Sequence, residues 1–289
     1  MKNTTNERGF RLAVAGKGGV GKTTLVALLA ELLARRGYQV LAADEDPQMN
    51  LALSLGVSPE EAEKIVPLSH NKAYIEEKTG TKPDSGWGGL LRLNPDVSDV
   101  VQRFGLQLKP NLSLLAMGSV DQAASGCLCP QNNLLKAVMR FIVLKPGEII
   151  LVDTQAGPEH FGRGVLKGFS LLLVVTEPTL TALQVAQKSM TFARQLAIPH
   201  RKLVVNKVRG EEDRNRVKTF MKRSGLESPA THFLPYTADL LALEPSVKPI
   251  LSREGEFTEA IKELFYDIKT LIPEKPIGPV LTGQTDQSG

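Results

Sequence analysis

Nine consecutive residues near the N-terminus, Gly16 to Thr24, combine glycines with two lysines and two threonines. Their sequence, GKGGVGKTT, satisfies the pattern G-x-x-x-x-G-K-[ST] and lies between an apolar run and a helical stripe of leucines. In that setting the glycines let backbone N–H groups converge on phosphate oxygens at a helix N-terminus. The Lys22 ammonium would neutralise the β and γ phosphates, and the Thr23 hydroxyl would bind Mg²⁺. The residues expected to contact the nucleotide are Gly18, Gly19, Val20, Gly21, Lys22, Thr23 and Thr24.

Acidic residues follow two further apolar runs. Asp153 comes directly after Ile149–Val152, the pattern of a buried strand that ends in a carboxylate, and Gly157 lies a few residues beyond. We expect Asp153 to hold Mg²⁺ through water, and the Gly157 N–H to approach the γ-phosphate and to sense its loss on hydrolysis. Asp44 and Asp46 lie at the end of the other run. Each could face a ligand at the carboxyl end of its strand, or cap a short helix that follows.

These residues need a frame of alternating strands and helices. The expected strands cover residues 11–15, 39–43, 113–116, 148–152, 171–176, 202–206 and 232–234. The expected helices include one closed by Gly37 and others at residues 131–144, 180–196, 211–223 and 257–272. Several strands are continuous apolar runs, as parallel strands buried on both faces usually are. The sequence therefore predicts an α/β fold, a P-loop NTPase with a mostly parallel β-sheet and helices on both faces.

The chain shows neither an internal repeat nor a composition break that would separate two domains. We expect a single P-loop domain over residues 11–272, with a flexible N-terminus at 1–10 and a flexible tail at 273–289. Residues 56–105 show the least periodicity and are expected to form an irregular insertion.

Composition excludes several other classes. A chain of 289 residues with 42% hydrophobic and 23% charged residues is globular, not disordered or fibrous. No apolar run reaches the roughly 18 residues of a membrane helix. Two cysteines cannot build a disulfide framework, so the cytoplasm is the expected compartment.

The net charge of +4 is concentrated in one window, residues 201–223, which holds nine lysines and arginines against three acidic residues. Such a window is most simply a solvated helix face. It could also dock an acidic partner protein, and its pattern, one helix face without interleaved aromatic residues, argues against nucleic acid.

The phosphate loop as a whole resembles the deviant Walker A loop of the ATPase class that includes MinD, ParA and the nitrogenase iron protein. The feature that carries the resemblance is Lys17, a lysine that an ordinary phosphate loop does not need. In that class this lysine reaches across a dimer to the nucleotide of the partner and acts like an arginine finger. The resemblance therefore implies a nucleotide-sandwich homodimer that hydrolyses ATP. The implied catalytic residues are Lys17, Lys22, Asp46 and Asp153.

Three further roles are implied by the resemblance alone. Asp46, just before Pro47, aligns with the residue that orients the attacking water, which leaves Asp44 a supporting role. Asn206 matches the residue that reads the adenine amino edge. Pro235 lies in a segment similar to the strand end that lines the other side of the base.

The two cysteines form a Cys-x-Cys pair, Cys127 and Cys129. In an extended segment residues i and i+2 point the same way, so both thiols can face one metal ion. Two thiolates fall short of the four ligands of a closed tetrahedral site, but a twofold dimer would supply the other two. Thiolates suit Ni²⁺ or Zn²⁺ rather than Mg²⁺. The alternatives are two small buried residues or a redox pair.

The cysteine pair narrows the resemblance. Gly126–Pro130 before a helix, together with Asp153 and the run AGPEHFGRG at Ala156–Gly164, resembles the CooC-type ATPases. These mature carbon monoxide dehydrogenase by supporting nickel insertion, and the related AcsF proteins serve acetyl-CoA synthase. The resemblance covers most of residues 11–272. It departs at Gln155, where the family usually has an acid, and at Glu45, where a small residue is usual.

The resemblance implies a cytoplasmic, Mg²⁺-dependent ATPase that binds ATP and ADP. Its expected partners are a second copy of the chain, joined through nucleotide and metal, and a client nickel enzyme, without membrane or nucleic acid. His160 could be a further ligand, a switch contact or a structural residue. Two alternatives stay open: a positioning ATPase of the MinD or ParA type, and a dimeric iron–sulfur carrier ATPase.

Overall fold

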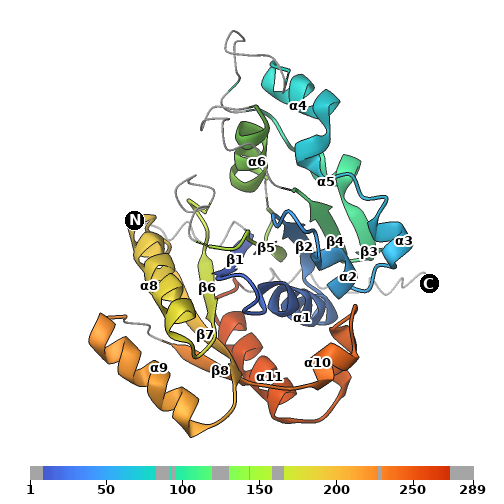
Figure 1. Ribbon diagram of the computed structural model, residues 1–289. Coiled ribbons are helices and arrows are strands. Elements are labelled where there is room, and N and C mark those ends of the chain that lie inside the picture. Colours follow the sequence, from blue (N-terminus) through green and yellow to red (C-terminus); the bar gives the residue numbers. More distant parts are fainter. Residues whose placement is uncertain are drawn as a thin grey trace, which may run out of the picture.

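The computed structural model describes residues 9–82, 92, 95–118, 130–142, 144–157, 166–226 and 230–273. Its centre is an eight-stranded sheet in the order β3-β4-β2-β5-β1-β6-β7-β8 (Figure 1). Every neighbouring pair is parallel except β3 and β4, which are antiparallel at one edge. The strands are β1 Phe10–Gly16, β2 Gln39–Asp44, β3 Leu106–Lys109, β4 Leu112–Ala116, β5 Glu148–Asp153, β6 Leu171–Thr176, β7 His200–Val208 and β8 Thr231–Pro235.

Both faces of the sheet are buried, which is why its strands read as continuous apolar runs. Along β1 the side chains alternate between two cores: Leu12 and Val14 face one, Ala13 and Ala15 the other. The first core is covered by α1 Lys22–Arg35 and α11 Glu256–Lys269. The second is covered by α6 Pro130–Phe141, α8 Leu180–Gln195 and, through Val217, α9 Glu211–Ser224 (Figure 1). This arrangement confirms the predicted fold class.

The short helices connect these layers. They are α2 Leu51–Ser54, α3 Pro59–Ala62, the 3₁₀ helix η2 Leu68–His70, α4 Lys72–Thr79, α5 Val100–Phe104, α10 Asp239–Ala242 and the 3₁₀ helix η3 Lys248–Ser252. Four of them lie within residues 56–105, the segment expected to be an irregular insertion. None of those four exceeds eight residues, so their apolar positions are too few to create a visible period. The edge strand β3 was likewise not predicted, because it is four residues long and none of them is buried.

The last helix, α11, packs on the protein's own core. Its apolar stripe of Phe257, Ile261, Leu264, Phe265 and Ile268 is buried beside α1 and β8. Within the described ranges, no helix is both long and apolar enough to cross a bilayer.

Candidate nucleotide site

The phosphate loop joins the end of β1 to the start of α1, at the carboxyl edge of the sheet (Figure 1). Gly19 and Gly21 take positive φ values of 78° and 98°, a conformation that side-chain-bearing residues rarely adopt. A Cβ atom on Gly21 would also lie 2.4 Å from Nδ2 of Asn206. Glycine is therefore required at position 21 both by backbone conformation and by space.

Lys22 opens α1 and is almost completely buried, with 6% of its surface exposed. Its ammonium donates a long hydrogen bond of 3.4 Å to the carbonyl oxygen of Lys17. Burial lowers the pKa of Lys22, and the charges of Asp153 and Asp46 oppose that change. A phosphate group beside this ammonium would add further negative charge, which stabilises the charged form of a buried lysine.

Asp44 and Asp153 end the neighbouring strands β2 and β5 and are partners in register. Asp153 is 1% exposed, and neither carboxylate oxygen has a hydrogen-bond partner among the described residues. Burial raises its pKa to about 7, and the charge of Asp44 adds to the rise. The Thr23 hydroxyl and the Lys22 ammonium act in the opposite direction. A buried carboxylate with unsatisfied oxygens beside a threonine hydroxyl fits the predicted magnesium site.

Asp44 holds the loop that follows its own strand. Its Oδ1 accepts a hydrogen bond from the Asp46 N–H, and its Oδ2 accepts one from the Leu51 N–H, both at 3.0 Å. Burial still raises its pKa to about 7, against these two hydrogen bonds. Asp44 thus makes the helix-capping contact at the start of α2 that was one of its two expected roles.

Asp46 lies further out on the same loop. It is half-buried, it lines the nucleotide cavity, and its Oδ1 accepts a hydrogen bond from the Gln48 N–H at 2.9 Å. The second carboxylate oxygen leaves it an acceptor for a water molecule in the cavity.

The segment after β5 lies against the phosphate loop. The Gly157 N–H donates a hydrogen bond of 3.1 Å to the carbonyl oxygen of Gly16, while Gln155 and Ala156 line the cavity. The Thr154 hydroxyl donates to the carbonyl oxygen of Val14 at 2.9 Å. The Gly157 N–H would have to leave Gly16 before it could reach a γ-phosphate.

Asn206 braces the loop from the opposite side. Its Nδ2 donates to the Val20 carbonyl oxygen and its Oδ1 accepts from the Lys207 N–H, both at 2.9 Å. Lys207, at φ 60°, donates from Nζ to the Gly19 carbonyl oxygen at 2.7 Å. The Asn-Lys pair therefore supports the loop directly, a role for Lys207 that sequence reasoning missed. Pro235 lines a separate small cavity with Tyr236.

Lys17 is half-buried and turned toward α8. Its Nζ donates a hydrogen bond of 3.2 Å to Oγ1 of Thr181, in the first turn of that helix. This is a contact within one chain and does not test the expected reach across a dimer.

Some of these residues line a cavity of about 780 Å³, within the range of small-molecule sites. The loop glycines, Lys22, Thr23, Thr24 and Asp46 line one part of it. Its remaining wall comes from residues that sequence reasoning did not single out: Pro47, Gln48, Asn50, Leu53, Ser54, Glu244, Pro245 and Val247. No local motif marks them, because α2 and the segment before η3 meet only in the folded chain.

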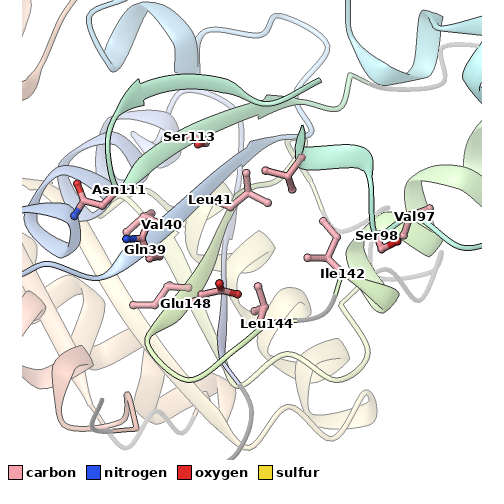
Figure 2. Close-up of a pocket in the computed structure, with 12 residues that line it drawn as sticks. Gln39, Val40, Leu41, Val97, Ser98, Asn111, Ser113, Ile142, Leu144 and Glu148 are labelled. Atoms are coloured by element: carbon pink, nitrogen blue, oxygen red, sulfur yellow. The ribbon is translucent and has the colours of Figure 1, made fainter. Parts of the chain in front are cut away.

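A second cavity, of about 290 Å³, opens at the amino ends of β2 and β5 (Figure 2). It is lined mainly by apolar side chains, including Val40, Leu41 and Ile142. Its carboxylate, Glu148, already accepts a hydrogen bond of 2.8 Å from the Lys145 N–H. The cavity lies at the amino ends of the strands, whereas the phosphate loop lies at their carboxyl ends, so the cavity takes no part in the site.

Cys127, Cys129 and His160 lie outside the described residues, so the predicted metal site has no structural description. Among the residues that are described, no group of three or more histidine, cysteine or acidic side chains could hold a metal ion. Of the other histidines, His232 binds Oδ2 of Asp267 at 2.7 Å.

The chain is similar to known nucleotide-binding proteins. The model of the CobQ/CobB/MinD/ParA nucleotide binding domain matches residues 12–250. An uncharacterized ATP-binding protein of Methanocaldococcus jannaschii is 38% identical over 90% of this chain and 98% of its own length. The carbon monoxide dehydrogenase accessory protein CooC of Rhodospirillum rubrum is 39% identical over 71% of this chain and 76% of its own.

Solved structures show the same fold. The cell division ATPase MinD of Pyrococcus furiosus superposes with a TM-score of 0.62 at 23% identity, covering 91% of this chain and 99% of that one. MinD of Aquifex aeolicus gives a TM-score of 0.61 at 20% identity, covering 90% and 97%.

Proposed function

Because the chain belongs to the CobQ/CobB/MinD/ParA nucleotide-binding family, we propose that it is a Mg²⁺-dependent ATPase that matures a nickel enzyme. The client would be carbon monoxide dehydrogenase or acetyl-CoA synthase. The observation that carries the proposal is the 39% identity to the Rhodospirillum rubrum CooC protein over 71% of the chain. The phosphate loop, Lys17 and the buried Asp153 supply the parts that ATP hydrolysis needs.

The triphosphate would lie along the glycine loop, with its β and γ groups at Lys22. Thr23 and, through water, Asp153 would hold Mg²⁺, which when bound neutralises charge on the phosphates. Asp46 faces the same cavity and would orient the attacking water. Gly19 and Gly21 set the conformation of the loop, and Lys207 braces it. The loop therefore holds its backbone N–H donors in place before the nucleotide binds.

Lys17 would complete the site of a partner protomer. Within the described residues its ammonium makes one hydrogen bond, to Thr181 of its own chain, so a modest rearrangement frees it. Positive charge arriving from a second chain makes hydrolysis depend on dimerisation. ATP would thus close the homodimer and hydrolysis would open it.

Cys127 and Cys129 from both chains would bind one Ni²⁺ or Zn²⁺ as cargo at the dimer interface. A positioning ATPase of the MinD or ParA type is less well supported. A membrane-binding member needs an amphipathic helix free to lie on lipid, and α11 is instead buried on its own core. The cytoplasm is the compartment that this proposal requires.

The deciding experiment is metal titration of the wild type and of a Cys127→Ala/Cys129→Ala variant, with molecular mass measured in parallel. We expect one metal per dimer in the wild type and none in the variant, while ATP hydrolysis persists in both. Equal Ni²⁺ affinity in the two proteins would contradict the cargo site. Activation of apo carbon monoxide dehydrogenase by the wild type with ATP and Ni²⁺, and not by the variant, would support the client.

A further inference from the structure

Some lysines and arginines of the basic window at residues 201–223 contact other groups of the protein, and others have no ion-pair partner among the described residues. Lys202 pairs with Asp267 at 2.7 Å, and Lys207 bonds the phosphate loop. In the first half of α9, Arg214 pairs with Glu211, and Arg216 pairs with Glu212 and Asp213. Arg201 bonds the Ile198 carbonyl, and Arg209 stacks over Tyr236 with 4.5 Å to the ring centre. These six are therefore part of the architecture.

The other three, Lys218, Lys222 and Arg223, lie on the last two turns of α9 and are exposed. Within the described part of the chain none of them forms an ion pair. The adjacent end of α8 adds Lys188 and Arg194, which are also exposed and unpaired there. A hydrogen bond of 2.8 Å from Gln187 to the Ser224 carbonyl oxygen holds the two helices together at this end. Exposed positive charge is thus concentrated on the last turns of α9 and on the second half of α8.

An open groove runs between the same two helices. It encloses about 640 Å³, and its walls include Leu180 from α8 and Thr219, Phe220 and Arg223 from α9. Leu180 is 61% exposed and offers an apolar side chain on the wall of the groove. Val217 is the one fully buried residue of α9, and Phe220 and Met221 pack partly buried against the second core.

We propose that the α8–α9 groove is a docking site for an acidic segment of another protein, with an apolar side chain seated beside Leu180 and Phe220. Carboxylates of that segment would lie against Lys218, Lys222 and Arg223. This docking site is independent of the identity of the client enzyme. Its face is formed by α8 and α9, and none of the three cations lines the nucleotide cavity.

Charge along the groove favours protein over nucleic acid. Arg216 shares the groove with Glu212, whose side chain is 91% exposed, and Glu211 nearby is 76% exposed. A phosphate backbone following the groove would meet these carboxylates, whereas a peptide can place its own charges only at the cationic end.

The test is fluorescence anisotropy at low salt with a labelled peptide of about four helical turns that carries glutamates in one half and leucines among neutral residues in the other. We expect Lys218→Glu/Lys222→Glu/Arg223→Glu to weaken its binding by about tenfold or more. The matched control, Lys64→Glu/Lys145→Glu/Lys269→Glu, reverses three exposed lysines elsewhere and should bind like the wild type. Thr219→Trp fills the groove without changing charge and should also weaken binding. ATP hydrolysis and the melting temperature report that each variant is folded.

Three results would overturn the inference. One is equal loss of binding in the control variant, which would show attraction to net charge only. Another is unchanged affinity when the peptide leucines are replaced by alanine, which would leave the groove without a role. The third is tighter binding of a DNA duplex than of the peptide through the same three residues, which would make the face a nucleic-acid surface.

Discussion

At the scale of single residues, the site depends on buried carboxylates whose charged form is disfavoured by their burial. Asp44 and Asp153 end adjacent strands, both are buried, and both have a pKa raised to about 7. Asp44 receives two backbone hydrogen bonds, whereas Asp153 receives none within the described residues. Asp44 is therefore stabilised by backbone N–H groups of the adjacent loop. Among the described residues the oxygens of Asp153 lack such contacts, so a bound cation would stabilise its charged form.

We expect the metal-free protein to lose stability as pH rises toward 7. The folded pKa of Asp153, about 7, lies above its ordinary value of 3.8. The folded state therefore holds more protons than the unfolded state between those values, and the free energy of unfolding falls as pH rises through the window. Melting temperatures measured in chelator from about pH 5 to about pH 8 should fall more steeply for the wild type than for Asp153→Asn.

The same variant tests the magnesium site. Mg²⁺ with a non-hydrolysable ATP analogue should raise the melting temperature of the wild type well above that of Asp153→Asn, since the carboxylate is what the cation neutralises. Melting curves that run parallel with pH, and respond equally to Mg²⁺, would show that Asp153 is neither strained nor a metal contact.

A second expectation concerns Gly21. Gly21→Ala puts a Cβ 2.4 Å from Asn206 Nδ2 on a residue with φ 98°, so we expect a loss of roughly 1–3 kcal/mol in unfolding free energy. ATP binding should be lost as well, because the loop must shift. Gly18→Ala is the control for stability, since its Cβ would approach Ala156 only to 3.6 Å. Denaturant melts of the two variants should therefore differ, and equal stability would contradict the crowding argument.

At the scale of elements, the helices and strands around the sheet are tied together by buried charge. Glu31, in the middle of α1, accepts hydrogen bonds from Lys109 of β3 at 2.6 and 2.7 Å and from Arg35 at 2.8 Å. Burial acts to raise the pKa of Glu31, but these two cations outweigh it and lower the pKa. This contact fastens the antiparallel edge hairpin β3–β4 to the helix that follows the phosphate loop.

Removing one cation should loosen that edge. Lys109→Met leaves a carboxylate that is 3% exposed with Arg35 alone, and we expect a cost of about 1–3 kcal/mol in unfolding free energy. Adding Glu31→Gln to Lys109→Met should recover part of the loss, since no buried charge then remains. Urea melts of both single variants and the double variant give the coupling energy. Strict additivity would mean that the pair contributes nothing to stability.

At the scale of the whole molecule, the open question is whether one chain completes the site of another. Lys17 contacts Thr181 of its own chain, whereas Asp46 lines its own cavity. If Lys17 acts on the partner's nucleotide, Lys17→Ala and Asp46→Asn should complement each other. A mixed dimer then has one intact site, built from Asp46 of one chain and Lys17 of the other.

We therefore expect Lys17→Ala to lose ATP hydrolysis by about 1,000-fold or more, the lower end for a finger residue. Asp46→Asn should lose about 100-fold or more, as for a residue that orients the attacking water. An equimolar mixture should recover about a quarter of the wild-type rate, because half of the dimers are mixed and each has one working site. Steady-state phosphate release measures this directly. A mixture as inactive as its components would place Lys17 in its own chain's site.

Local sequence determined the parts of this protein that depend on backbone conformation and period. The loop glycines, the acids that end β2 and β5 and the continuous apolar strands are local features, and the fold they predicted is the one observed. Helices of one or two turns, such as α4, were not predicted, because so short a segment has too few apolar positions to show a helical periodicity.

Side-chain partnership was decided only by tertiary structure. Nothing in the sequence pairs Lys207 with Gly19, Lys17 with Thr181, or Glu31 with Lys109, since each pair is far apart in the chain. The net charge of the basic window likewise does not reveal which of its lysines and arginines pair with other groups in the fold. The cations of β7 and of the first half of α9 are paired within the fold, whereas those on the last turns of α9 have no ion-pair partner among the described residues and lie beside an open groove. The physical reason is that conformation and period are set by neighbours along the chain, whereas burial and charge pairing are set by neighbours in space.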